Sequence, residues 1–140
     1  ELVNAYDNTI AYTDHFLDAA LQWLKRRATA GANDTGLIYV SDHGESLGEH
    51  GLYLHGAPYA VAPDEQTHVP MMLWASERYS ARRSMDLRCI RGRANAPLSH
   101  DNFFHSVLGL AGVDTAAHKP ALDLFGACDA TVSEAHPGAK

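Results

Sequence analysis

Apolar residues recur at helical spacings along the first part of the chain. From Leu2 to Arg27 they form one stripe, with steps near three, four and seven positions, which predicts an amphipathic helix packed on a sheet. Gly31 follows where a helix of this kind is commonly capped. The stripe consists of Tyr6, Ile10, Phe16, Leu17, Leu21 and Leu24.

Two short apolar runs predict strands. Leu37 to Val40 follows a turn at residues 33–36 and is short enough for a buried parallel strand. Val69 to Ala75 predicts a second buried strand, with Pro70 near its start, where a missing N–H is tolerated. A helix, a short loop and a strand make half of a β-α-β unit, so we expect an α/β fold.

The rest of the chain predicts less regular structure. Residues 41–68 are rich in glycine and histidine without periodicity, so we expect one long loop that is ordered by a metal ion. A helical or irregular arginine-rich segment should run to about Pro97, followed by a helix capped by Ser99 and ended by Gly112. Residues 122–125 predict a last short strand or a turn. We assign residues 1–128 to one domain and expect residues 129–140 to be a disordered tail.

The group of side chains best suited to metal binding is Asp42-His43-Gly44-Glu45, directly after the first predicted strand. Ligands of α/β sheets bind at the carboxyl ends of strands. Asp oxygen and His nitrogen together are a usual zinc ligand mixture, and Gly44 lets the backbone bend so that both can face one point. Zinc takes about four ligands, so Asp42 and His43 alone do not complete a site. An isolated Asp-His pair is otherwise typical of a capped loop.

A longer string gives these residues a context. Residues 41–75 closely resemble the phosphoethanolamine transferases of Gram-negative inner membranes, which include the lipid A modifiers behind polymyxin (colistin) resistance. The resemblance also takes in residues 4–14 and 99–106. These enzymes belong to the alkaline phosphatase and sulfatase superfamily, so the resemblance implies part of a sandwich of helices around a mostly parallel sheet.

The resemblance also implies roles for four residues. Asp42 and His43 match zinc ligands, and His55 matches a histidine that binds either the substrate phosphate or a second zinc ion. Without the resemblance, a Leu-His-Gly turn is more often structural. Glu45 is expected either to orient His43 or to act as an accessory ligand, with a loop cap as the alternative.

The implied reaction is the zinc-dependent transfer of phosphoethanolamine from phosphatidylethanolamine to lipid A or a core sugar. The nucleophile of this family is a threonine that would lie upstream of residue 1, so we expect the isolated chain to be inactive. The alternatives are another superfamily enzyme, namely a phosphoglycerol transferase, phosphodiesterase or sulfatase, or a noncatalytic metal-binding fragment.

Composition and charge restrict the partners. A net charge of -6 argues against nucleic-acid binding. No run approaches the ~20 apolar residues of a spanning helix, and we expect the chain to be the C-terminal piece of an inner-membrane protein, on the periplasmic side. Six arginines between Arg78 and Arg93 form either a solvated face or a patch for anionic lipid. Cys89 and Cys128 either pair or stay as free thiols, which the sequence leaves open.

Overall fold

The structure is a computed structural model that describes residues 1–31 and 33–129. The chain divides into two units, residues 1–76 and residues 77–140, and each is described by itself. The expected tail at 129–140 lies outside the described residues apart from Asp129. No helix among the described residues is long and apolar enough to cross a bilayer.

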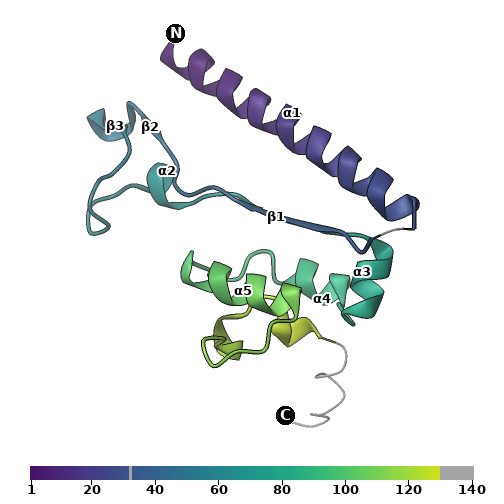
Figure 1. Cartoon of the computed structure of the whole chain (residues 1–140). Coiled ribbons are helices and arrows are strands. Elements are labelled where there is room, and N and C mark those ends of the chain that lie inside the picture. Colours follow the sequence, from purple (N-terminus) through teal and green to yellow (C-terminus); the bar gives the residue numbers. More distant parts are fainter. Residues whose placement is uncertain (32, 130–140) are drawn as a thin grey trace. The chain divides into compact units, whose positions relative to one another are not determined.

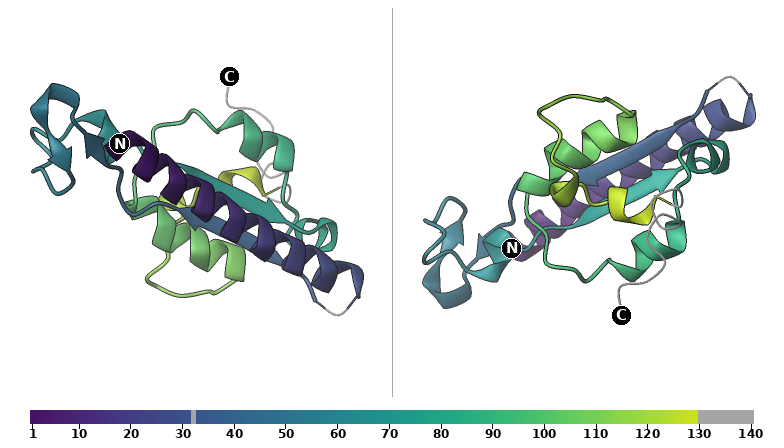
Figure 2. Two further views of the ribbon diagram at one scale, coloured as in Figure 1. Left: turned by 90° about the horizontal axis from the view of Figure 1, so that it is seen from above. Right: turned by 90° about the horizontal axis from the view of Figure 1, so that it is seen from below.

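The first unit begins with the predicted helix. Helix α1 spans Leu2–Thr29 and ends where Gly31 adopts a positive φ of 71°, as expected of a cap. It runs along one face of a pair of strands (Figures 1 and 2). Leu17 is its buried residue, whereas Ile10 and Phe16 are exposed, so the predicted stripe was wrong for these two. Adjacent residues on a helix point about 100° apart, and Phe16 and Leu17 therefore cannot share one narrow face.

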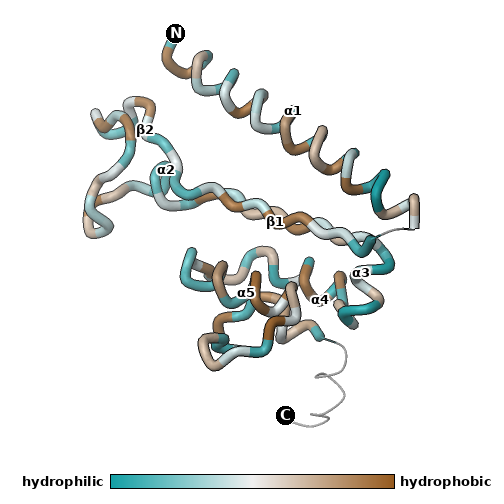
Figure 3. Tube along the Cα trace, in the orientation of Figure 1, coloured by the Kyte–Doolittle hydropathy of each residue, from teal (hydrophilic) through white to brown (hydrophobic). Residues whose placement is uncertain are grey.

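The two predicted strands pair with each other. Strand β1 spans Gly36–Val40 and strand β4 spans Met71–Ala75, and they are antiparallel. Strongly hydrophobic residues alternate with paler, less hydrophobic ones along this pair (Figure 3). The expectation of a buried parallel strand at 37–40 was wrong in two respects, because β1 pairs antiparallel and its apolar residues are only half-buried. A continuous apolar run indicates that both faces of a strand are covered by other parts of the protein. It does not indicate whether the neighbouring strand is parallel or antiparallel.

The segment between these strands is more regular than predicted. It contains a small antiparallel hairpin of β2, Ser46–Leu47, and β3, Tyr53–Leu54, joined through the 3-10 helix η1, Glu49–Gly51. A short helix α2, Asp64–Thr67, precedes β4. The hairpin and α2 lie together beyond the end of the β1–β4 pair (Figure 1). The prediction of a single loop at 41–68 was therefore wrong, because strands of two residues are too short to give a readable pattern.

The second unit is helical. It contains α3, Glu77–Arg82, α4, Leu87–Gly92, and α5, Asp101–Ala111, followed by the 3-10 helices η2, Pro120–Leu122, and η3, Gly126–Cys128. The helix predicted between Ser99 and Gly112 is confirmed, but its N-cap is His100 rather than Ser99. The Ser99 hydroxyl accepts from the Asp101 amide at 3.2 Å, and Gly112 ends α5 with a left-handed φ of 67°. Residues 124–125 form a turn, the second of the two expectations for this segment.

A disulfide joins α4 to η3. Cys89 and Cys128 are bonded, with their Cα atoms 5.6 Å apart, which settles the question that the sequence left open. Cys128 is buried, and its carbonyl accepts from the Asp86 amide at 2.9 Å. The fully buried Ser106 on α5 fixes the same region, since its hydroxyl accepts from the Leu124 amide at 3.0 Å.

Asp86 caps α4, and its role predicts a pH dependence. Its carboxylate accepts from the backbone amides of Cys89 and Arg88, which lower the pKa of Asp86 below its ordinary value. A lowered folded-state pKa gives stability that is present above the unfolded pKa of about 3.9 and is lost as the pH falls through the folded pKa. We expect Asp86→Asn to be less stable than wild type at neutral pH, with the gap closing in acid. Denaturant titrations at several pH values check this, and Asp114→Asn, at an exposed acid, is the control.

Candidate metal site

The Asp42-His43-Gly44-Glu45 turn lies where β1 leaves its partner. The Ser41 amide still donates to the Pro70 carbonyl at 3.2 Å, after which the chain turns away. His43 Nδ1 lies 2.8 Å from the Gly44 carbonyl oxygen. A carbonyl can only accept, so Nδ1 carries the proton and Nε2 keeps a lone pair for a metal.

Asp42 lies beside that nitrogen. Its Oδ2 is 3.8 Å from His43 Nε2, and its side chain is 90% exposed. Two ligands of one zinc ion lie at most about 4.2 Å apart, the sum of two zinc–ligand distances. Asp42 and His43 can therefore bind one ion without a change in the backbone, and the ion would be accessible to solvent on the side of Asp42.

His55 lies against His43. The two imidazole rings stack with centroids 3.8 Å apart and an interplanar angle of 26°. His55 Nδ1 is 3.0 Å from Glu45 Oε2, a distance at which the imidazole donates to the carboxylate. Of the roles expected for Glu45, orienting His43 is not seen, because its hydrogen bond goes to His55, whereas the role of an accessory ligand stays a prediction. The carboxylate–imidazole pair leaves His55 Nε2 as the free ring nitrogen.

His43, Glu45 and His55 together suit a cation. Each offers one ligand atom, and these atoms lie within 4.8 Å of one another, which is more than the span of one zinc ion, so the side chains would have to turn slightly for all three to share an ion. Glu45 Oε1 is buried and has no hydrogen-bond partner among the described residues. A buried carboxylate oxygen without a donor is costly, and a metal ion would satisfy it. The donor set of imidazole nitrogen and carboxylate oxygen fits zinc.

Helix α2 holds both halves of the site. The Gly44 amide donates to the Gln66 carbonyl at 2.9 Å, and a Cβ at Gly44 would lie 2.0 Å from the Glu65 carbonyl oxygen. The buried Gln66 side chain donates to the Ser46 hydroxyl at 2.8 Å and accepts from the Ala57 amide at 3.2 Å. Gln66 thus ties the strand after His43 to the chain after His55. Sequence reasoning missed this residue, because one glutamine in a polar stretch carries no signal.

Gln66→Leu tests this tie. The substitution keeps the side-chain size but leaves the Ser46 hydroxyl and the Ala57 amide without their partner. In the full-length protein we expect metal affinity to fall by about 10–100-fold, as for other groups that hold ligands in place, and stability to fall by about 1–3 kcal/mol. Metal titration and denaturant unfolding measure the two effects. Gln22→Leu is the matched control, since Gln22 is exposed on α1; equal losses in both variants would contradict the role of Gln66.

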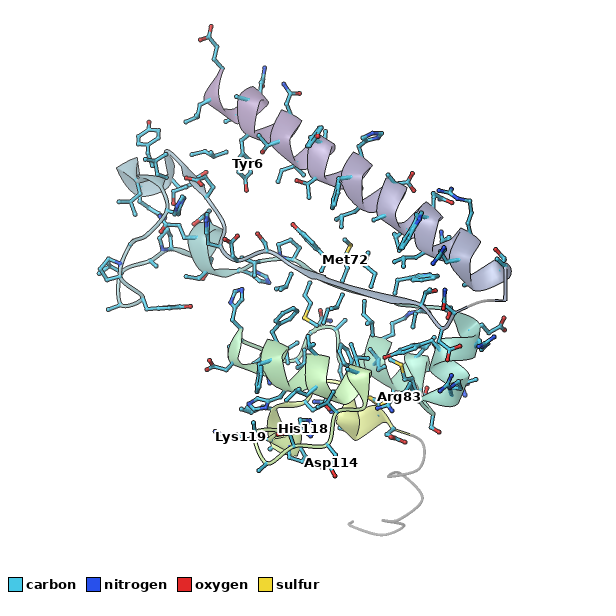
Figure 4. All side chains as sticks on the ribbon, viewed as in Figure 1. Tyr6, Met72, Arg83, Asp114, His118 and Lys119 are labelled. Carbon is cyan, nitrogen blue, oxygen red and sulfur yellow. A yellow bond between two sulfur atoms is a disulfide. The ribbon has the colours of Figure 1, made fainter. Side chains whose placement is uncertain are left out.

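The second unit has a hollow of its own. It has a volume of about 300 Å³, and its lining includes Arg83, His118 and Asp123, the first two of which Figure 4 labels. His118 Nε2 pairs with the buried Asp123 carboxylate at 3.2 Å, and Arg83 donates to the Gly109 carbonyl. These polar groups hold α5 and its following loop, and none of the sequence-predicted site residues is among them. Arg83 therefore has a structural contact, whereas a lipid role for the arginine-rich segment stays a prediction.

Comparison with known proteins gives a consistent picture. The sulfatase family pattern matches residues 1–113. Phosphoethanolamine transferase EptA of Escherichia coli K12 is 48% identical over 129 residues, which are 91% of this chain and 23% of that protein.

Two solved structures are similar in fold and sequence. The integral membrane protein lipooligosaccharide phosphoethanolamine transferase A from Neisseria meningitidis is 42% identical, with a TM-score of 0.84 over 91% of this chain and 24% of that one. The C-terminal periplasmic domain of phosphoethanolamine transferase EptC from Campylobacter jejuni is 41% identical, with a TM-score of 0.74 over 88% of this chain and 37% of that one. The chain thus spans less than half the length of each of these relatives.

Proposed function

Because this chain belongs to the sulfatase family, we propose that the protein carrying it is a zinc-dependent phosphoethanolamine transferase of the inner membrane. The residues described here would lie on its periplasmic side. The observation that carries the proposal is the gathering of His43, Glu45 and His55, within the string that resembles these transferases. The similar proteins are themselves named phosphoethanolamine transferases, which supports the same activity.

The proposed donor is phosphatidylethanolamine and the proposed acceptor is lipid A or a core sugar. A threonine outside this chain would take up the phosphoethanolamine group while diacylglycerol leaves, and the acceptor would then take the group from the threonine. Such a two-step transfer divides one difficult displacement into two easier ones. The present residues would then bind metal and substrate rather than form the covalent bond.

His43 and Asp42 are the proposed zinc ligands from this chain. Zinc bound there would lower the pKa of the attacking hydroxyl and stabilise charge on the phosphoryl oxygens. The hydrogen bond from His43 Nδ1 to Gly44 favours the tautomer of the neutral ring in which Nε2 carries the lone pair. The lone pair needed for a ligand is thereby available without a change of tautomer.

His55 is the proposed contact for the substrate phosphate, or a ligand of a second zinc. Glu45 holds Nδ1 of His55, so the other ring nitrogen can bind a metal when neutral or donate to a phosphate oxygen when protonated. The unpartnered Glu45 Oε1 adds a further acceptor for a cation.

Mass spectrometry of lipid A tests the proposal. Cells that express the full-length gene should accumulate lipid A with the added mass of phosphoethanolamine, and cells that express His55→Ala should accumulate less. An added glycerol phosphate would indicate a phosphoglycerol transferase. Unmodified lipid A and core, with the protein folded and in the membrane, would favour a phosphodiesterase, a sulfatase or a noncatalytic metal-binding protein.

A further inference from the structure

A group of large apolar side chains is exposed around His55. It consists of five residues within ten positions, and we call it the apolar rim: Leu52, Tyr53, Leu54, Tyr59 and Val61. Three of them are among the most exposed large apolar residues of the described chain, namely Leu54 at 69%, Tyr59 at 88% and Val61 at 68%. Single exposed apolar residues are ordinary, but five within ten positions of the chain suggest a surface that meets another apolar phase or partner.

The same segment carries no formal charge. Residues 50–63 contain no Asp, Glu, Lys or Arg, in a chain of which 20% is charged. A loop exposed only to water would have no reason to exclude charged side chains over this length. Tyrosines beside leucine and valine are the mixture found where protein meets the interface of a bilayer.

The backbone presents these side chains in a defined conformation. Leu54 has a φ of 67°, which is rare for a residue other than glycine, and Gly51 and Gly56 also have positive φ values. The β2–β3 pairing holds one end of the rim, and the bond between the Ala57 amide and Gln66 holds the middle. The turn therefore fixes the backbone conformation from which the Leu54 side chain projects.

Building on the proposed function, we propose that the apolar rim rests on the surface of a phospholipid bilayer, so that the donor lipid's headgroup is met at His55 while its acyl chains stay in the membrane. Leu54 and Gly56 are the neighbours of His55 in the chain, so the candidate phosphate contact lies within the same segment as the rim. A phospholipid has the same arrangement, with its phosphate directly above the hydrocarbon region. An uncharged rim also avoids repulsion from anionic headgroups.

Fluorescence quenching tests the contact without relying on activity. The full-length protein with Tyr59→Trp is placed in vesicles whose acyl chains carry bromine near the headgroup, and Val113→Trp serves as the control. Val113 is likewise exposed, in the second unit. The proposal predicts that the tryptophan at position 59 is quenched, and the tryptophan at position 113 gives the reference value for an exposed position outside the rim. Absence of quenching at position 59 would overturn the proposal, whether or not the protein is a transferase.

A kinetic comparison separates the rim from the reaction. The variant Leu54→Asn/Tyr59→Ser/Val61→Ser keeps a residue at position 54 that tolerates positive φ. Its transfer rate from phosphatidylethanolamine in vesicles should fall by about tenfold or more, because three apolar contacts are removed. Its rate with a short-chain, water-soluble donor should not change. The control Leu87→Ser/Leu98→Ser/Val113→Ser, also at exposed positions, should retain both rates.

Equal losses with both donors would show that the rim acts within the protein and not on the membrane, which would overturn the proposal. A wild type without transfer from either donor would instead refute the proposed function. The quenching result would then still decide whether the rim meets lipid.

Discussion

Replacing His43 by alanine in the full-length protein is expected to abolish phosphoethanolamine transfer and most zinc binding. His43 Nε2 is the ring nitrogen left with a lone pair by the bond from Nδ1 to Gly44, and Asp42 lies within the span of one ion. Loss of groups that merely support metal ligands costs about 10–100-fold, so loss of a ligand should cost at least about 100-fold in transfer rate. Metal content of the purified protein and transfer to lipid A are the two measurements.

The control for this variant is His15→Ala, because His15 is exposed on α1 and outside the site. It should keep both zinc and activity. A His43→Ala protein that folds and transfers phosphoethanolamine at the wild-type rate would contradict the ligand assignment. Loss of activity with full zinc content would instead indicate that His43 contacts the substrate and does not bind the metal.

Removing the disulfide is expected to have the largest effect on stability. The double variant Cys89→Ala/Cys128→Ala should lose about 2–5 kcal/mol, the usual range for a native disulfide in a small domain. The bond spans 39 residues and joins α4 to the buried end of η3, so it restricts the unfolded chain over most of the second unit. Denaturant unfolding of wild type and variant measures the difference.

Reduction provides the control for this variant. A reductant should destabilise the wild type by a similar amount and leave the double variant unchanged. If the reduced wild type were as stable as the oxidised one, the bond would not contribute to the stability of the fold.

The strongest sequence patterns gave correct predictions. The long stripe in residues 2–27 predicted α1, and the glycines at positions 31 and 112 end helices as expected. The string at 41–75 predicted a sulfatase-type α/β fold, which the family match and the related structures confirm. These patterns are local. Each one either repeats over many residues or consists of a specific series of amino acids.

The failures concern information that is not local. The direction of β1 depends on how the chain returns through β4, which four apolar residues cannot encode. The pairing of Glu45 with His55 depends on the β2–β3 hairpin, whose strands have only two residues each. Gln66 acts through a fold that brings three segments together. The site could be located from the sequence, but its hydrogen bonds could not.

Anomalous diffraction at the zinc absorption edge tests the central claim most directly. Crystals of the full-length protein grown with zinc should give a peak about 2.0–2.2 Å from His43 Nε2 and from a carboxylate oxygen of Asp42. A second peak near His55 and Glu45 would identify these residues as ligands of a second zinc ion. Without a second peak, His55 would keep the proposed role of binding the substrate phosphate. A fully occupied zinc site elsewhere in the protein, with none at His43, would contradict the account.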